Sequence, residues 1–313
     1  MYMPRLRASQ HELFAVRTCA KAFSARGTVT PVLEPVKKLD ALTVRRINAI
    51  AEDGLRCALV LNPSVGLHSR AGDWRDVGRF YLDNGMLATH GIAVLSNSAA
   101  EHTEMSGWIE SVRTKQNDLT LDVIHERDLS PTLRGNLYTD VRYNIAIDRS
   151  VPSSYGLPLS GLPVIWFDDP FPLVEKNAEF VGRGESIFSA RVATFRSAGY
   201  AGVSDFLTIG GRYQKGGGPA YAVALHLTYQ VGNDIRMRHF CSHTNDSQDD
   251  PAGKFFEALD KLVAFASEQT LPANPGLDEF RELHARRHFP GLGKAKEHSM
   301  VNHLSVMEAA IRR

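Results

Sequence analysis

The chain has 313 residues, of which 43% are hydrophobic and 23% are charged, as expected for an ordinary globular protein with a substantial core. Lys and Arg number 36 against 35 Asp and Glu, so no global basic field indicates nucleic acid as a partner. The three cysteines (Cys19, Cys57 and Cys241) are few and widely separated, which argues against a disulfide framework or a cysteine zinc site and predicts a reducing compartment.

The N-terminal segment MYMPRLRASQHELF lacks the apolar core of a signal peptide. No run of the sequence approaches the roughly 18 apolar residues that a membrane-spanning helix needs. We therefore expect a cytoplasmic protein that does not associate with membranes.

Strand-like runs recur along the chain, after an amphipathic helix predicted over 11–23 that would cover the floor of a barrel. Most of these runs are almost continuously apolar and end in a polar residue or a turn, which is typical of strands buried on both faces. They span 29–36, 57–62, 91–97, 119–124, 142–148, 162–168, 203–210 and 220–229.

Helix-like segments lie between most of the predicted strands. They span 41–54, 72–85, 99–113, 130–138, 184–199 and 250–268. Asp249 or Asp250 is the expected N-cap of the last of these helices. Two gaps interrupt the alternation, because 150–161 is too rich in Pro, Ser and Gly for a helix and 211–219 is too short for a crossover. A further strand over 234–242 is expected to form a hairpin with 220–229.

Eight strands with interleaved helices in about 250 residues predict an irregular (β/α)8, TIM-like barrel. An open α/β sheet with an antiparallel edge is the alternative. We expect three parts: an N-terminal capping helix in 1–27, the barrel in 28–270, and a helical appendage in 271–313 that packs on the barrel.

Barrel enzymes carry their chemistry at the carboxyl ends of the strands. The residues predicted there as catalytic are Glu34, Asp148, Asp168, Asp205 and His226, and near them we expect Asn62, Asn97, His125, Glu126 and Asp169. Such a set could bind a divalent metal or supply an acid and a base. The alternative is that strand-end Asp and Asn residues cap the following helices, as Asp40 and Asp128 are expected to do.

A second candidate site is basic. Alternation along DIRMRHF places Arg236 and Arg238 on one strand face, where they could hold a phosphate or carboxylate together with Lys215. The alternative for the arginines is an edge strand protected by charge. The segment GGRYQKGGGP around Lys215 is not a P-loop, because the lysine precedes the glycines and a strand follows. We interpret it as a gating loop.

The C-terminal appendage contains four histidines. His298 and His303 are five residues apart on one predicted helix, so they do not stack as metal ligands at a spacing of four would. His284 and His288 precede them. A structural role, or a lid over the barrel, is favoured over a metal site.

Several segments resemble a known family. They are MYMPRLRASQHELFAVR, VTPVLEPVKK, LNPSVG, GYAGVSDFLTIGG, AVALHLTY, IRMRHFCSHTNDSQDDPAGKFFEALDKL and HFPGLGKAKEHSMVNHLSVME. Together they resemble, in order, the bacterial sce-seventy-seven-twenty-five family, which is similar to the phage beta-protein family. The resemblance implies a barrel-like fold and a role in phage defence beside a nuclease-like neighbour. Ser204-Asp205-Phe206 departs from the SDY pattern of that family.

Two hypotheses follow from these features. In the first, the barrel acts on or senses a phosphorylated or nucleotide-like ligand at its carboxyl-terminal rim, as a metal-dependent or acid–base hydrolase or lyase if it is an enzyme. In the second, the protein is a non-catalytic scaffold for a neighbour-encoded partner, since no strong catalytic motif occurs. Fold alone does not decide between them.

Overall fold

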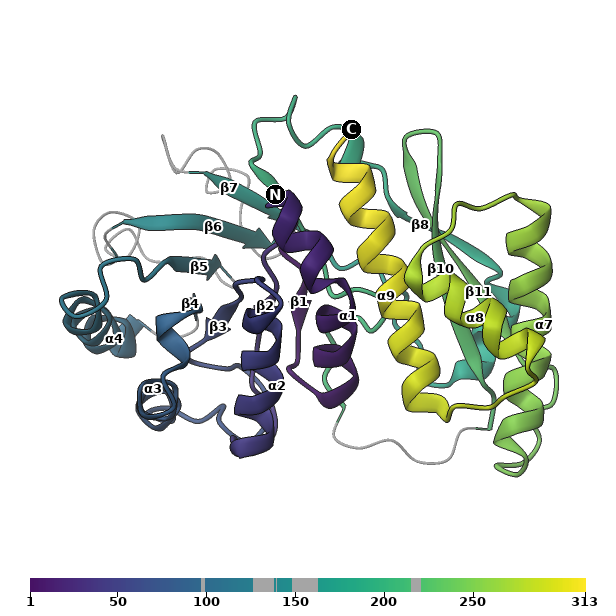
Figure 1. The fold of residues 1–313 in the computed structure, drawn as a ribbon, viewed down its shortest axis with the longest axis horizontal. Helices are drawn as coiled ribbons and strands as arrows, with labels where there is room; N and C mark the ends of the chain where they lie inside the picture. Colours follow the sequence, from purple (N-terminus) through teal and green to yellow (C-terminus); the bar gives the residue numbers. More distant parts are fainter. Residues whose placement is uncertain (97–98, 126–137, 139, 148–162, 215–220) are drawn as a thin grey trace. The chain divides into compact units, whose positions relative to one another are not determined.

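The computed structural model describes residues 1–313 except 97–98, 126–137, 139, 148–162 and 215–220 (Figure 1). Its described residues form two compact units. The barrel unit comprises Met1–Leu13, Ala20–Asp168 and Phe195–Asp205. The sheet–helix unit comprises Phe14–Cys19, Asp169–Thr194 and Phe206–Arg313.

Eight parallel strands within the described residues form the sheet of the barrel unit, in the order β1-β2-β3-β4-β5-β6-β7-β9. They are β1 (Arg5–Leu6), β2 (Val32–Leu33), β3 (Ala58–Val60), β4 (Gly91–Leu95), β5 (Leu121–His125), β6 (Val141–Ile147), β7 (Val164–Phe167) and β9 (Gly202–Ser204). Tyr2 bridges both Val29 and Val203, which brings the two ends of the sheet together. The result is a nearly closed barrel flanked by helices, so the predicted TIM-like fold is confirmed.

The N-terminal segment closes the barrel as its first strand. On one side the backbone N–H of Arg5 donates to the carbonyl of Asp205 at 2.8 Å, and on the other the N–H of Val32 donates to the carbonyl of Pro4 at 2.8 Å. Pro4 has no N–H to donate but still accepts a bond, so it is tolerated here. The prediction that 220–229 is the eighth barrel strand is therefore wrong.

Helices of the barrel region follow individual strands along the chain. They are α1 (Gln10–Arg26), α2 (Ala41–Glu52), α3 (Trp74–Asp83), η1 (Met86–Ala88) and α4 (Ala99–Arg113). The helix predicted over 11–23 is α1, but it connects β1 to β2 and does not precede the first strand. Asp40 caps α2 as expected, because its side chain accepts from the N–H of Thr43 at 2.8 Å.

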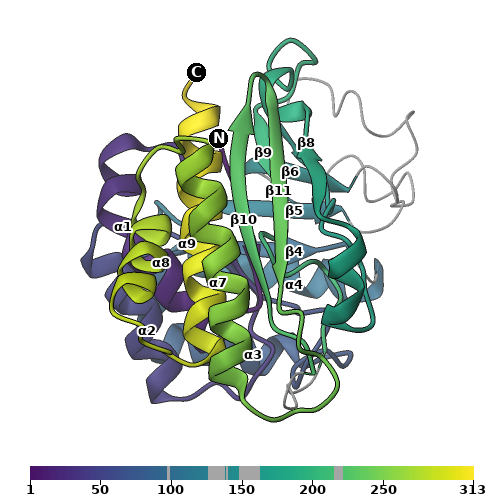
Figure 2. The ribbon, with the colours of Figure 1, turned by 90° about the vertical axis from the view of Figure 1, so that its right-hand side faces the viewer.

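Three antiparallel strands form the sheet of the other unit, in the order β10-β11-β8 (Figure 2). They are β10 (Ala224–Val231), β11 (Asp234–Cys241) and β8 (Glu185–Ser189). The predicted hairpin between β10 and β11 is confirmed. The helix predicted over 184–199 is wrong: this segment forms β8 and the short η3 (Arg191–Ala193). Pairing with β11, some 50 residues further along the chain, overrides its helix-like periodicity.

Helices lie against both faces and one edge of this sheet. They are η2 (Asn177–Gly182), α7 (Pro251–Glu268), α8 (Pro275–Ala285) and α9 (Leu292–Ile311). Side chains of β10 and β11, among them Leu227 and Phe240, share a buried core with Phe255 and Leu262 of α7. Asn302 of α9 accepts a hydrogen bond from the backbone N–H of Thr228 at 2.9 Å, so α9 protects the edge strand β10.

Asp250 is the N-cap of α7, as the sequence predicts, since its side chain accepts from the N–H of Gly253 at 2.8 Å. Gly276 lets α8 approach α9 closely, because a Cβ at this position would lie 2.3 Å from the backbone nitrogen of Asn302. None of the helices in the described part of the chain combines the length and the apolar character needed to cross a membrane.

Barrel closure gives a test on two glycines. A Cβ at Gly202 in β9 would lie 1.9 Å from the carbonyl oxygen of Met1, whereas a Cβ at Gly107 in α4 would meet nothing within 4 Å. We expect Gly202→Ala to lower the free energy of unfolding by about 1–3 kcal/mol. The control Gly107→Ala should raise it by about 0.5–1 kcal/mol, because alanine favours a helix. Urea unfolding measures both, and a Gly202→Ala protein as stable as the wild type would contradict this account of closure.

Candidate functional site at the carboxyl end of the barrel

Glu34, which directly follows β2, is the centre of a buried charged cluster. Its Oε2 accepts from Nη2 of Arg5 at 2.8 Å and from Nε of Arg5 at 3.2 Å, and it also contacts Nη1 of Arg7. Its Oε1 accepts from the backbone N–H of Ser64 at 2.8 Å and from the Ser64 hydroxyl at 3.0 Å. Glu34 is fully buried, with 0% of its surface exposed. We call Arg5, Arg7, Glu34 and Ser64 the rim cluster.

The two arginines determine the protonation state of this cluster. Burial alone would raise the pKa of Glu34, but the Arg5 and Arg7 guanidinium groups and the hydrogen bonds from Arg5 and Ser64 outweigh burial and hold that pKa below its ordinary value. Glu34 is therefore ionised at neutral pH. The rim cluster then carries two positive charges and one negative charge.

Asp205 directly follows β9, the neighbour of β1 across the barrel closure. Its Oδ1 accepts a hydrogen bond from the Tyr2 hydroxyl at 2.9 Å, and only 2% of its surface is exposed. Tyr2 thus supplies a phenolic hydroxyl to this aspartate, while the next residue in the chain is Phe206. This bond orients the Asp205 carboxyl group at the same end of the barrel as Glu34.

Asp168 directly follows β7, which pairs with β9. Its backbone N–H donates to the carbonyl of Ser204 at 3.0 Å, and its side chain is partly exposed. Asp168, Asp205 and Glu34 therefore lie at the carboxyl ends of β7, β9 and β2. With β1 these strands are consecutive around the barrel, so three of the five predicted catalytic residues lie at neighbouring strand ends.

Other residues predicted near the rim make local structural bonds. The Asn62 side chain donates to and accepts from the backbone of Leu95, both at 2.8 Å, and so links the ends of β3 and β4. His125 lies 2.8 Å from Asn144 through its Nε2, and burial lowers its pKa. Asp169 accepts from the N–H of Gly211 at 2.8 Å.

Four predicted site residues lie outside the described residues. They are Asn97, Glu126, Asp148 and Lys215. The same holds for Asp128 and for the helix predicted over most of 130–138. Their predicted roles stay predictions.

His226 is not on or next to a strand of the barrel sheet. It lies on β10 in the sheet–helix unit, where its Nδ1 is 2.9 Å from Nδ1 of His239 on β11. Its placement at the rim was wrong because it depended on 220–229 being a barrel strand. Burial, with His239 and Lys296 nearby, lowers the pKa of His226 well below its ordinary value.

Arg236 and Arg238 share one face of β11, as the alternation predicts, but two carboxylates, those of Glu185 and Asp234, balance their charges. Arg236 Nη1 lies 2.7 Å and Arg238 Nη1 3.7 Å from the carboxylate of Glu185 on β8, which also accepts from the Tyr229 hydroxyl. The alternative of an edge strand protected by charge is wrong, because β11 is the middle strand of its sheet.

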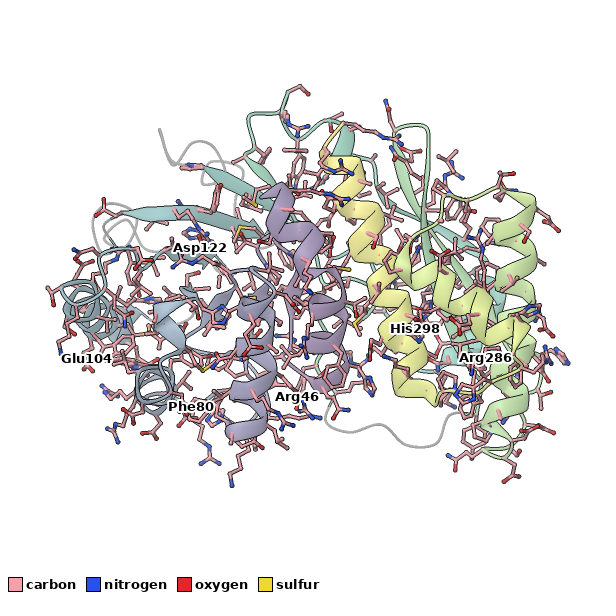
Figure 3. All side chains as sticks on the ribbon, in the orientation of Figure 1. Arg46, Phe80, Glu104, Asp122, Arg286 and His298 are labelled. Atoms are coloured by element: carbon pink, nitrogen blue, oxygen red, sulfur yellow. The ribbon has the colours of Figure 1, made fainter. Side chains whose placement is uncertain are left out.

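The histidines of α9 make structural contacts in the sheet–helix unit. His303 is fully buried, with its Nδ1 2.8 Å from the hydroxyl of Thr228 and its ring against Phe188. His298, labelled on α9 in Figure 3, packs its ring against Phe280 of α8. In the part of the chain that the structure describes, no group of three or more His, Cys, Asp or Glu side chains is arranged to hold a metal ion.

Sequence reasoning missed Arg5, Arg7 and Tyr2 because it placed the N-terminal segment outside the barrel. The available signal was MYMPRLR itself, an apolar and basic run before a helix, but it is short and contains a proline. Comparison with models of known protein families and with curated protein sequences finds no match for this chain. Function must therefore be inferred from the geometry of these residues.

The rim cluster predicts a strong effect of Glu34→Gln on stability. The substitution leaves two arginines beside each other without their carboxylate, which should lower the free energy of unfolding by about 3–5 kcal/mol at pH 7. The control is Glu104→Gln, because Glu104 is an exposed residue of α4 that pairs with Arg75 (Figure 3) and should contribute less than about 1 kcal/mol. Urea unfolding of the three proteins measures this, and equal effects of the two substitutions would contradict a stabilising rim cluster.

The same residue predicts part of the acid sensitivity of the protein. A carboxyl group whose pKa is lower in the folded than in the unfolded state stabilises the fold above its unfolded pKa, about 4.3 for glutamate, and loses that effect as the pH falls through the folded value. We expect the stability difference between wild type and Glu34→Gln to shrink below about pH 4. Unfolding curves from pH 7 to pH 3 test this, and a constant difference would refute it.

Proposed function

We propose that the protein binds a small phosphorylated or otherwise anionic ligand, such as a nucleotide-like molecule, at the carboxyl-terminal rim of its barrel. The observation that carries the proposal is the rim cluster, in which two arginines share one carboxylate at the ends of β1 and β2. Parallel barrels bind their ligands at this end. Guanidinium groups are the side chains best suited to phosphate and carboxylate.

The carboxylates beside the rim cluster support a chemical role at the same place. Asp205 and Asp168 lie at the ends of the two strands that precede β1 around the barrel, and Asp205 is oriented by the Tyr2 hydroxyl. A carboxylate near a bound phosphate ester could act as a general base or acid. Within the proposal, the arginines hold the ligand and these aspartates supply the acid–base chemistry of a hydrolase or lyase.

Isothermal titration calorimetry with inorganic phosphate, pyrophosphate and adenosine monophosphate tests the proposal. We expect saturable binding of at least one of these anions that weakens as salt increases. The Arg7→Gln protein should bind it at least tenfold more weakly, because one guanidinium group of the rim cluster is gone.

The matched control is Arg142→Gln. Arg142 pairs with the buried Asp122, which is labelled in Figure 3, and its Nε lies 3.0 Å from Oδ1. The pair is at the start of β5 and β6, away from the rim. Its loss also breaks a buried pair in the barrel but should leave anion binding unchanged. The proposal fails if none of the anions binds, or if the two substitutions weaken binding equally.

A second candidate is a scaffold for a neighbour-encoded protein in a phage-defence system, which rests on the family resemblance. One feature of the structure favours a partner surface: a depression of about 500 Å³ between α3 and α4, lined by aromatic and charged side chains. They are Trp74, Arg75, Arg79, Leu82, Glu104 and Trp108. Co-purification of the wild type with proteins encoded beside its gene, compared with an Arg79→Glu variant, distinguishes this role from ligand binding, which Arg79→Glu should not alter.

A further inference from the structure

Three polar side chains form a continuous chain across one face of the sheet in the sheet–helix unit. Ser186 on β8 places its Oγ 3.1 Å from Nε2 of His239 on β11. The other ring nitrogen of His239, Nδ1, lies 2.9 Å from Nδ1 of His226 on the next strand, β10. The strand register explains the arrangement, since His226 is directly opposite His239 and Ser186 is opposite Met237, two residues before His239.

The number of protons on the ring nitrogens limits the roles that these three hydrogen-bonded side chains can have. Two nitrogens 2.9 Å apart share one proton, so one of the two Nδ1 atoms donates and the other accepts. When His239 donates from Nδ1 to His226, its Nε2 carries a lone pair and accepts from the Ser186 hydroxyl. This tautomer makes His239 a general base for Ser186, with His226 holding its ring in place, the arrangement of a catalytic triad.

Two phenylalanines surround the imidazole rings and keep them neutral. Phe171 and Phe180 contact the ring of His226 with centroids 5.1 Å and 4.8 Å away, and Phe180 also lies 4.6 Å from His239. Burial, with Arg183 as a further cause, lowers the pKa of His239 to about 4. His239 is thus unprotonated at neutral pH and able to take a proton. Ser186, in contrast, is partly exposed on the edge strand.

We propose that Ser186 is a catalytic nucleophile that takes the acyl group of a carboxylic ester, with His239 as its general base and His226 as a positioning residue. All three residues belong to the sheet–helix unit, and the proposal does not rest on the proposed function of the rim cluster. Of the three residues, only His226 was singled out from the sequence as a catalytic candidate. Ser186 was missed because its segment has the pattern of a helix.

The reaction balances with water as the only co-reactant. Ser186 Oγ attacks the ester carbonyl carbon while its proton moves to Nε2 of His239. The bond from carbon to the leaving oxygen then breaks, and that oxygen takes the proton from His239 to leave as an alcohol. Water next attacks the acyl-serine, gives its proton to His239, and the carboxylic acid departs as the proton returns to Ser186.

Basic side chains lie near the two imidazole rings and bear on the kind of substrate. Arg183 acts on His239 and Lys296 on His226, in each case through their positive charges. Positive charge at these places favours the negative oxygen that develops during attack on a carbonyl. The substrate class that we infer is therefore an ester of a small carboxylic acid, with an added anionic group tolerated.

Labelling with a fluorophosphonate probe tests the nucleophile directly. The serine oxygen displaces fluoride from phosphorus and loses its proton, so a labelled protein gains the mass of the probe less that of HF, and peptide mapping locates the label. We expect stoichiometric labelling of Ser186 in the wild-type protein and none in Ser186→Ala. The control is Ser189→Ala, because Ser189 lies on the same strand and accepts only a backbone bond from Arg191 in the described structure. It should label like the wild type.

Further variants distinguish the role of His239 from that of His226. His239→Gln should lower the rate of labelling by the probe by a factor of about 100 or more, because the general base is lost. His226→Leu, which cannot accept the Nδ1 proton of His239, should also slow labelling, whereas His226→Asn should recover much of the rate because its amide oxygen can accept that proton. A merely structural histidine would not show this recovery, since both substitutions remove the ring.

A parallel measurement with p-nitrophenyl acetate tests the ester class. We expect release of p-nitrophenolate together with an acetylated protein, both absent from Ser186→Ala. The proposal is overturned if the wild-type protein, shown to be folded by circular dichroism, is not labelled at Ser186. It is also overturned if His239→Gln labels at the wild-type rate, or if Asn and Leu at position 226 behave alike. The wild-type result decides the matter even if a histidine variant does not fold.

Discussion

The insertion of the N-terminal strand between β9 and β2 is the constraint on which the barrel unit depends. β1 supplies the backbone groups that satisfy both neighbours, through the bonds from Arg5 to Asp205 and from Val32 to Pro4. The same short segment carries the side chains of the rim cluster, so closure of the barrel and assembly of the site are one event. Without it, β2 and β9 would be open edges and Glu34 would be a buried charge with no arginine beside it, bonded only by Ser64.

Both units pair buried charges. Glu34 lies against two arginines in the barrel unit, and Glu308 pairs with Arg312 in the sheet–helix unit. The sheet–helix unit also contains neutral histidines bonded to each other, as His226 is to His239. A paired charge resists small displacements and would hold the proposed anion site rigid. A neutral imidazole donates a hydrogen bond from one ring nitrogen and accepts one at the other.

The sequence was most informative where a single pattern decided the structure. The barrel strands β2 to β7 were predictable because strands buried on both faces are continuously apolar, and α7 was predictable from its apolar stripe and the cap at Asp250. Two strands were not predicted, the one around Ser186 and β1, for different reasons. The segment around Ser186 forms a strand only beside β11, and β1 is too short, with its proline, to show a strand pattern.

The candidate site was predictable only in part for the same reason. Glu34, Asp168 and Asp205 could be located from the ends of apolar runs, because a strand end is a local feature. The side chains that bond to Glu34 and Asp205 could not be located in this way, since Arg5 and Tyr2 belong to an N-terminal segment that was not recognised as part of the barrel. His226 was selected for chemistry but assigned to the wrong sheet, and its neighbours His239 and Ser186 depend on a register that only the folded structure defines.

Barrel closure also has a consequence for the order in which the protein can form during synthesis. Tyr2 and Asp205, which hydrogen-bond across the closing strands, are 203 residues apart in the chain. At a ribosomal speed of roughly 5–20 residues per second, the first strand waits on the order of 10–40 s for its partner to be made. During that time, the edge of β1 that pairs with β9 in the folded protein is unpaired in the nascent chain. The incomplete nascent chain can therefore bind chaperones or form competing strand pairs for longer than the chain of a protein whose contacts are local in sequence.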